Sequence, residues 1–253
     1  MRAARQRSIV GRLRVHGTAS TEELADLCGV SIATVRRDLI ELERLGQLRR
    51  VHGGAVTTAV ADADAVRGFA EVAATDAAEK TAVVRRAAAM VRDGDCVVLD
   101  IGTTTMLLAR ELRGRHVTVV TASLAVLDVL HGDEAVELIL LGGVVRRTYH
   151  SLVGSLTEDA LRQVHGALVF LGASGVRADG TVLDTTAVEV PVKRALLGAG
   201  DTSVLLVDRH KMPGTGSLRV CGAGAVDVLV TNDGADRATL AACREAGTEV
   251  VLA

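Results

Sequence analysis

The sequence predicts an α/β protein in two parts, a small helical head and a larger body built on a mostly parallel sheet. Two observations predict it. From about Asp76 onward, helical segments alternate with short strands that are apolar almost throughout, which is typical of strands buried on both faces of a parallel sheet. The first 56 residues instead hold three short helical patterns, followed by a segment that alternates and then turns.

Composition is typical of a globular chain, with 253 residues, 49% hydrophobic and 24% charged. No run of about 18 apolar residues occurs, and the N-terminus lacks the apolar stretch of a signal peptide, so we expect a cytoplasmic protein with no membrane partner. Four widely spaced cysteines form no CxxC pair, which argues against a zinc site or a disulfide framework. We expect no metal and no cofactor.

Charge is unevenly distributed along the chain. The net charge is −2, yet residues 1–52 hold ten arginines against six acidic residues. A basic head on an acidic body favours contact between the head and a polyanion. One tyrosine and two phenylalanines are too few for a base-stacking platform, so a module for single strands or RNA is disfavoured.

The head begins with three predicted helices. Residues 5–16 form the first, which Gly17 ends. Ser20, with Glu23 three residues later, has the form of a capping box that opens a second helix. Residues 28–30 then make a tight turn into the third. Two short helices around a glycine turn are typical of a helix-turn-helix.

The third helix directs its apolar positions, Val35, Leu39 and Leu42, toward the core. Its N-terminal end is the part that reaches base edges in the major groove. The polar residues left facing outward there are Ser31, Thr34, Arg36 and Arg37. Residues 47–54 alternate and turn like the hairpin of a winged helix. The basic side chains expected to lie along DNA phosphates are Arg49, Arg50 and His52.

The predicted domain boundaries follow from these patterns. Residues 1–56 form the winged helix-turn-helix domain, 57–75 a linker with one short helix, and 76–253 the α/β body. The strands expected in the body are residues 96–99, 117–120, 136–141, 167–171, 204–207, 226–230 and 250–252. Ligands of such sheets bind at the carboxyl ends of the strands, where Asp100, residues 121–123, 142–143 and 172–175, and Asp208 fall.

Residues 100–105, Asp-Ile-Gly-Thr-Thr-Thr, follow one strand and open a helix. Gly102 lets a ligand approach the backbone, three hydroxyls can bond phosphate oxygens, and the free amides of the first turn point the same way. The alternative is that these hydroxyls only cap the helix. The position of the loop at a strand end favours the anion site.

Lysine is scarce in this chain. Only Lys80, Lys193 and Lys211 occur among 29 basic residues, so a lysine here indicates a positioned ammonium more than a generic surface charge. Lys193 lies four residues after Glu189, on the same helix face, and Lys211 follows a strand end. Arg146 or Arg147 either reaches the same ligand or lies in a solvated loop. His165 and His210 are interpreted as structural.

The head resembles the DNA-binding head of the DeoR family of bacterial sugar-responsive regulators. The matching run is Glu23-Leu24-Ala25, Val30-Ser31, Thr34 to Leu39, Leu42-Glu43, Gly46 and Arg50 to Ala55. The body is similar to the DeoR-type sensor domain, which is related to ribose-5-phosphate isomerase and glucosamine-6-phosphate deaminase. Departures from the family pattern occur at residues 69–72, which lack an arginine, at 121–123, and at Asn232.

This resemblance implies a phosphorylated sugar as effector, with residues 102–105 around the phosphate. The residues it implies at the effector site are Lys80, Asp100, Gly102, Thr103, Thr104, Thr105, Gly142, Gly143, Asp184, Glu189, Lys193, Asp208 and Lys211.

We therefore expect a homo-oligomeric repressor, a dimer or tetramer, that binds operator DNA and is released by the sugar phosphate. One alternative is a sugar-phosphate isomerase or deaminase fused to a DNA-binding head, because carboxylates such as Glu189 can shuttle protons. Another is a degenerate sensor that binds DNA constitutively.

Overall fold

The computed structural model describes residues 2–16, 18–44, 48–51, 53–57 and 69–253. The chain divides into two compact units at Gly68/Phe69, and each is described by itself. The predicted linker, 57–75, therefore overlaps the end of the head sheet and the first helix of the second unit.

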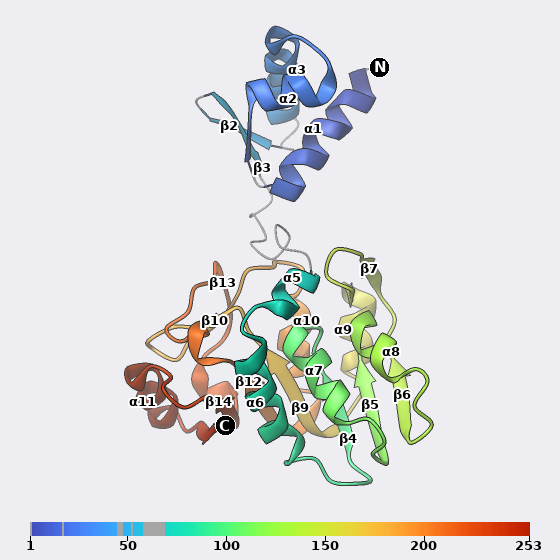
Figure 1. The fold of residues 1–253 in the computed structure, drawn as a ribbon, viewed down its shortest axis with the longest axis vertical. Coiled ribbons are helices and arrows are strands. Elements are labelled where there is room, and N and C mark those ends of the chain that lie inside the picture. Colours follow the sequence, from blue (N-terminus) through green and yellow to red (C-terminus); the bar gives the residue numbers. More distant parts are fainter. Residues whose placement is uncertain (1, 17, 45–47, 52, 58–68) are drawn as a thin grey trace. The chain divides into compact units, whose positions relative to one another are not determined.

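The head contains the predicted helix-turn-helix and wing (Figure 1). Its elements are α1 (Arg2–His16), β1 (Thr18–Ser20), α2 (Thr21–Cys28), α3 (Ile32–Arg44), β2 (Leu48–Val51) and β3 (Gly54–Thr57). The capping box between Ser20 and Glu23 is present, and Gly29 ends α2 in the left-handed conformation. The short strand β1 was not predicted. It pairs antiparallel with β3, where a Cβ on Gly54 would lie 2.2 Å from the Ala19 carbonyl oxygen.

The core of the head joins all three helices to the wing. Its fully buried members include Ile9, Leu24, Val35, Leu39, Leu42 and Leu48. One buried charge, Asp38 of α3, is hydrogen-bonded by Arg5 of α1 at 2.6 Å. The Arg5 guanidinium compensates the buried charge of the Asp38 carboxylate. Because the two residues belong to different helices, the same ion pair holds α1 against α3.

The second unit is built on a seven-stranded sheet with the order β15-β14-β12-β9-β4-β5-β6. Every neighbouring pair is parallel, so the predicted sheet is confirmed. Its strands are β4 (Cys96–Leu99), β5 (Val117–Thr121), β6 (Val136–Leu140), β9 (Gly166–Gly172), β12 (Gly200–Leu206), β14 (Val228–Thr231) and β15 (Glu249–Leu252). All seven lie where the apolar runs predicted strands, with ends shifted by a few residues.

Helices cover both faces of this sheet because the strands alternate their side chains between two cores. Val97 and Leu99 pack with α6 (Ala77–Ala88), α7 (Thr103–Glu111) and α8 (Leu124–Leu130). Val98 and the alternate positions of neighbouring strands pack with α9 (Ser155–Leu161), α10 (Val190–Leu196) and α11 (Arg237–Glu245). Strands buried on both sides explain the uninterrupted apolar runs.

The other elements of this unit are a first helix, a hairpin, a small sheet and two single-turn helices. A helix, α5 (Phe69–Ala74), opens the unit, and β7 (Val144–Arg146) pairs with β8 (Ser151–Val153) as a hairpin. A small antiparallel sheet contains β10 (Gly175–Val176), β11 (Val182–Asp184) and β13 (Leu218–Cys221), and two single-turn helices are η1 (Arg209–Lys211) and η2 (Ala223–Ala225). Within the described residues, no helix has the length and apolarity needed to cross a bilayer.

Candidate effector site and DNA-binding helix

Polar residues converge at the carboxyl edge of the parallel sheet. Asp100 follows β4, Thr121 ends β5, Asp208 follows β12 and Thr231 ends β14. All four side chains are buried. Parallel strands end at one edge, so these groups share it with the N-terminus of α7.

Lys193 is the centre of this cluster. Its ammonium, on α10, is ion-paired with Asp100 Oδ2, donates to the Gly172 carbonyl oxygen at 3.0 Å and lies 3.6 Å from Asp184 Oδ2. Burial alone lowers the pKa of this ammonium, but the negative charges of Asp100, Asp184 and Glu189 outweigh it and leave the pKa above its ordinary value. Lys193 is therefore a permanent buried cation between carboxylates.

Glu189 precedes the first turn of α10 and is buried beside that cation. Its carboxyl is paired with the guanidinium of Arg146, from β7, and the Arg146 side chain is itself only 12% exposed. Burial raises the pKa of Glu189 to about 8, and the positive charges of Lys193 and Arg146 offset only part of this rise. Arg146 thus lies in a buried ion pair and not in solvent, whereas Arg147 is exposed.

The loop before α7 leaves backbone amides free at the N-terminus of the helix. Gly102 is the N-cap residue, and the first helical hydrogen bond runs from the Met106 amide to the Gly102 carbonyl, which leaves the amides of residues 103–105 ahead of it. A Cβ on Gly102 would meet only Thr105 Oγ1, at 3.9 Å, so the fold does not require glycine there. The Thr105 hydroxyl lies 2.7 Å from the Asp100 carbonyl oxygen and 2.9 Å from that of Gly102, which fixes the loop.

Four buried side-chain oxygens of the described residues have no hydrogen-bond partner. They are Asp100 Oδ1, Asp208 Oδ2, Thr231 Oγ1 and Ser151 Oγ. The first three lie at the strand-end edge. Buried oxygens without a partner are costly, and the cost is removed when a bound group donates to them. Nearby, Lys211 Nζ donates to the Ala173 carbonyl oxygen at 2.8 Å.

Three predicted site positions have other local contacts. The buried ammonium of Lys80, on α6, donates to the Val72 carbonyl oxygen of α5 at 2.6 Å. Gly142 accepts a hydrogen bond from Thr157 Oγ1 at 2.8 Å, and a Cβ on Gly143 would lie 2.1 Å from the same oxygen. Gly143 therefore serves close packing against α9, whereas a Cβ on Gly142 would meet open space.

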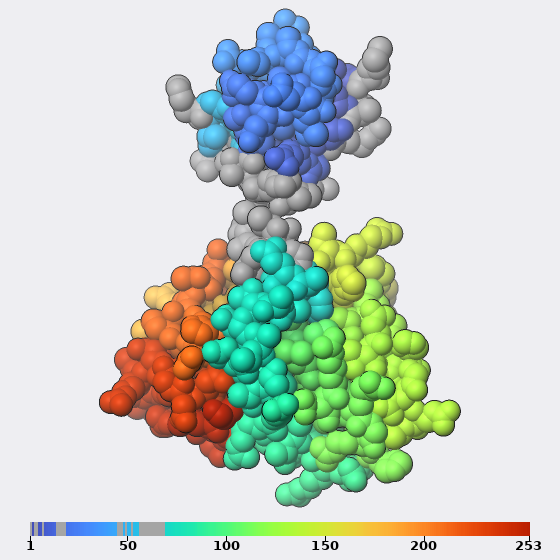
Figure 2. Space-filling model, viewed as in Figure 1, coloured from blue at the N-terminus to red at the C-terminus, as the bar shows by residue number. Residues whose placement is uncertain are grey.

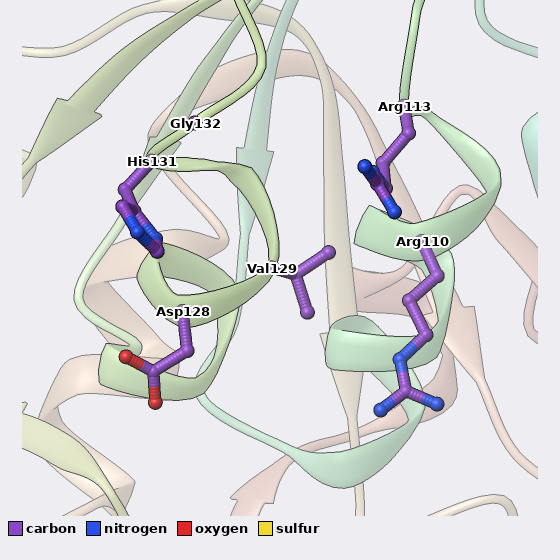
Figure 3. Close-up of a pocket in the computed structure, with 6 residues that line it drawn as sticks. All are labelled: Arg110, Arg113, Asp128, Val129, His131 and Gly132. Atoms are coloured by element: carbon purple, nitrogen blue, oxygen red, sulfur yellow. The ribbon is translucent and has the colours of Figure 1, made fainter.

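Two other features of this unit do not resemble ligand sites. A shallow pocket between the ends of α7 and α8 has Arg110 and Arg113 on one side and Asp128 and His131 on the other (Figure 3). Helix C-termini disfavour anions there. The ligand atoms of Asp76, Glu79 and His210 lie within 4.8 Å of one another, but Arg209 Nη2 is 3.1 Å from Glu79 Oε1, so ion pairing accounts for the group.

In the head, α3 presents the predicted polar face. Arg36 and Arg37 are exposed, and the Ser31 hydroxyl accepts from the Thr34 amide at 3.3 Å, so Ser31 caps the helix. The Arg50 amide donates to Glu43 Oε1 at 2.7 Å, which ties the wing to α3. His52 and the side chain of Arg49 lie outside the described residues.

A helix-turn-helix head joined to an α/β body with a buried polar site at its strand ends defines a DNA-binding regulator with a sensor domain. Residues 5–59 match the DeoR-like helix-turn-helix domain, and residues 75–233 match the DeoR C terminal sensor domain. The chain belongs to the DeoR family of transcriptional regulators. The head therefore binds DNA and the sensor domain binds an effector.

Similar proteins span nearly the full length. GolR, an HTH-type transcriptional regulator of Listeria innocua, is 30% identical over 98% of both chains. The L-fucose operon activator of Escherichia coli is 30% identical over 92% of this chain and 96% of its own. The glycerol-3-phosphate regulon repressor of E. coli is 31% identical over 90% of both. These relatives are transcriptional regulators and not enzymes. Ribose 5-phosphate isomerase A of Methanocaldococcus jannaschii aligns with a TM-score of 0.40 and 19% identity, over 54% of this chain and 55% of its own.

Proposed function

We propose that this protein is a cytoplasmic repressor of sugar-metabolism genes, which a phosphorylated sugar releases from operator DNA. The observation that carries the proposal is the set of buried, unpartnered oxygens at the strand-end edge, on Asp100, Asp208 and Thr231. Carboxylate oxygens accept hydrogen bonds, and sugar hydroxyls are donors spaced closely enough to reach several of them.

The phosphate of the same ligand has a complementary place at the start of α7. Free amides and the helix dipole at Thr103 and Thr104 favour an anion, and Gly102 leaves space above the backbone. The proposed contact residues are Asp100, Gly102, Thr103, Thr104, Asp184, Glu189, Lys193, Asp208 and Lys211. Lys80, Thr105, Gly142 and Gly143 are proposed to support the site through their own contacts.

Sugar-derived ligands also agree with the names of the relatives. One is named for the L-fucose operon and another for the glycerol-3-phosphate regulon. These names include an activator and a repressor. Repression is the sign of regulation that we propose.

On DNA, the proposed contacts come from α3 and the wing. Arg36 and Arg37 would read bases, Ser31 and Thr34 would contact bases or phosphates, and Arg49, Arg50 and His52 would lie along phosphates. One short head covers too little DNA for a specific site. The proposal therefore includes a homo-oligomer, a dimer or tetramer, on a two-fold operator, which light scattering of the purified protein checks.

A thermal-shift screen tests the effector. The full-length protein is melted with ribose 5-phosphate, glucose 6-phosphate, fructose 6-phosphate and glycerol 3-phosphate, each beside its unphosphorylated parent and inorganic phosphate. We expect one phosphorylated compound to raise the melting temperature, with its parent and inorganic phosphate giving far less, and Asp208→Asn to reduce the shift. Equal shifts from a compound and its parent would overturn the phosphate assignment.

A further inference from the structure

The chain enters the sensor unit through an aromatic cluster. Phe69 is the first residue of α5 and of the unit, and its side chain is buried. The Tyr149 ring meets it edge-on, with ring centroids 5.4 Å apart, and the His150 ring stacks on it at 5.5 Å. The chain has one tyrosine and two phenylalanines, so two of its three aromatic residues meet at this point.

The same cluster extends to the candidate effector site. The guanidinium carbon of Arg146 lies 5.0 Å from the centroid of the Tyr149 ring, within cation–π range, while the guanidinium is paired with Glu189. The planar guanidinium of Arg146 therefore contacts both Glu189 in the candidate site and Tyr149 in the aromatic cluster. In Figure 2, α5 (teal) lies at the surface beside the yellow-green segment that contains β7.

A second connection begins at residues 102–105, where we propose that the phosphate binds. Met106 follows Thr103 to Thr105 on α7 and packs in the cluster with Phe69 and Tyr149, as does Ala125 on the first turn of α8. Lys80 holds the other end of α5 through the Val72 carbonyl oxygen. The position of α5 thus depends on residues adjacent to the site from two directions.

We propose that Arg146, Tyr149 and Phe69 form the device that couples the effector site to α5, and through α5 to the chain segment leading to the DNA-binding head. This inference rests on the proposed function. A phosphate competes well for a guanidinium because it accepts two parallel hydrogen bonds. Burial raises the pKa of the Glu189 carboxyl, which weakens its hold on the Arg146 guanidinium.

An anion that draws the Arg146 guanidinium away from Glu189 also moves it relative to the Tyr149 face, and the edge-on contact with Phe69 changes with it. Such a ligand biases the head only if it favours one arrangement of this cluster over another. Couplings of this kind correspond to changes of roughly 5- to 150-fold in affinity.

The experiment uses the full-length protein and a DNA duplex that it selects from a random library. The affinity for this duplex is measured with and without whichever of the four phosphorylated compounds of the screen gives the largest thermal shift. Phe69→Leu is the test variant. Phe170→Leu is its matched control, because Phe170 is fully buried in the sheet core, outside the aromatic cluster.

We expect the sugar phosphate to change the DNA affinity of the wild type and of Phe170→Leu by at least about fivefold. Phe69→Leu should bind the sugar phosphate and the duplex, each measured alone, with affinities within about twofold of the wild type. The effect of the sugar phosphate on its DNA affinity should nevertheless be mostly lost. A full change in Phe69→Leu would overturn the inference and leave the proposed function intact. Absence of binding by the wild type to all four phosphorylated compounds would instead overturn the proposed function, and the inference with it.

If Phe69→Leu does not fold, hydrogen exchange of the wild type tests the coupling between the effector site and α5. In the wild type, the sugar phosphate should change the exchange of the amides in α5 and of the next amide, that of Thr75, which donates to the Glu71 carbonyl oxygen at 3.2 Å. Unchanged exchange in α5, with protection gained around residues 103–106, would contradict the coupling.

Discussion

Lys193 of α10 is ion-paired with Asp100, 93 residues earlier in the chain at the end of β4. Both side chains are buried, and Asp184 adds a second carboxylate 3.6 Å from the ammonium. This pair joins β4 of the parallel sheet to α10, and Asp184 adds the end of β11, from the small antiparallel sheet, at the edge where a ligand is expected. It also sets up a clear energetic test.

Lys193→Met should lower the free energy of unfolding by about 3–5 kcal/mol, because it leaves two buried carboxylates without their cation. The double variant Asp100→Asn/Lys193→Met should recover part of that loss. Urea denaturation measures both. Arg162→Met is the control, since Arg162 and Asp159 form an exposed pair, and it should change stability by less than about 1 kcal/mol. A small loss in Lys193→Met would contradict the structural role of the pair.

Gly102→Ala should fold with stability within about 1 kcal/mol of the wild type but bind the sugar phosphate roughly tenfold more weakly. The added methyl group contacts only Thr105 Oγ1 in the protein, so it would occupy the space that we propose for the ligand.

Gly143→Ala provides a contrast in stability with Gly102→Ala. Its Cβ would lie 2.1 Å from Thr157 Oγ1, so it should cost about 1–3 kcal/mol of stability. Calorimetric titration and urea melts compare the two. Unchanged binding by Gly102→Ala would remove the loop from the site.

Glu189 should make stability depend on pH. The unfolded chain releases this proton near the ordinary value of 4.5, and the folded protein only near 8. Between these values the folded state binds more protons, so stability falls as pH rises, by up to about 1.4 kcal/mol per unit, and levels off above 8. Glu189→Gln carries no titrating proton. The stability of the wild type relative to Glu189→Gln should fall between pH 6 and 8, and a constant difference would show that Glu189 is ionised throughout.

Arg37→Ala should weaken binding to the selected duplex by roughly 5- to 150-fold, corresponding to 1–3 kcal/mol, without changing the melting temperature of the head. Arg37 is exposed, whereas the neighbouring Asp38 is buried against Arg5. Asp38→Ala should therefore destabilise the head. Gel-shift titrations and thermal melts separate the two effects, and equal DNA affinity for Arg37→Ala and the wild type would mean that another face of α3 reads DNA.

The parallel sheet could be predicted because its signal is local. Each strand is an apolar run long enough to recognise, and burial on both faces removes the polar interruptions of other strands. The β7–β8 hairpin and the sheet of β10, β11 and β13 carry no such signal. Their strands contain two to four residues and are held by pairing with distant segments.

The candidate site was predictable in its residue types more than in its contacts. The scarcity of lysine predicted positioned ammonium groups, and those of Lys80 and Lys193 are buried, but spacing alone gave Glu189 as the partner of Lys193. The hydrogen-bonded partner is Asp100, which only the tertiary fold brings near. The contact between Phe69 and Tyr149 likewise spans 80 residues of chain, and no local pattern predicts it.

The central claim is that a phosphorylated sugar at the strand-end site controls DNA binding by the head. Fluorescence anisotropy of the selected duplex, titrated with full-length protein, tests it most directly. With the sugar phosphate that gives the largest thermal shift, the affinity for DNA should fall at least about fivefold, and the unphosphorylated parent sugar should have no effect. An affinity for DNA that stays constant while the same sugar phosphate is bound would contradict the account.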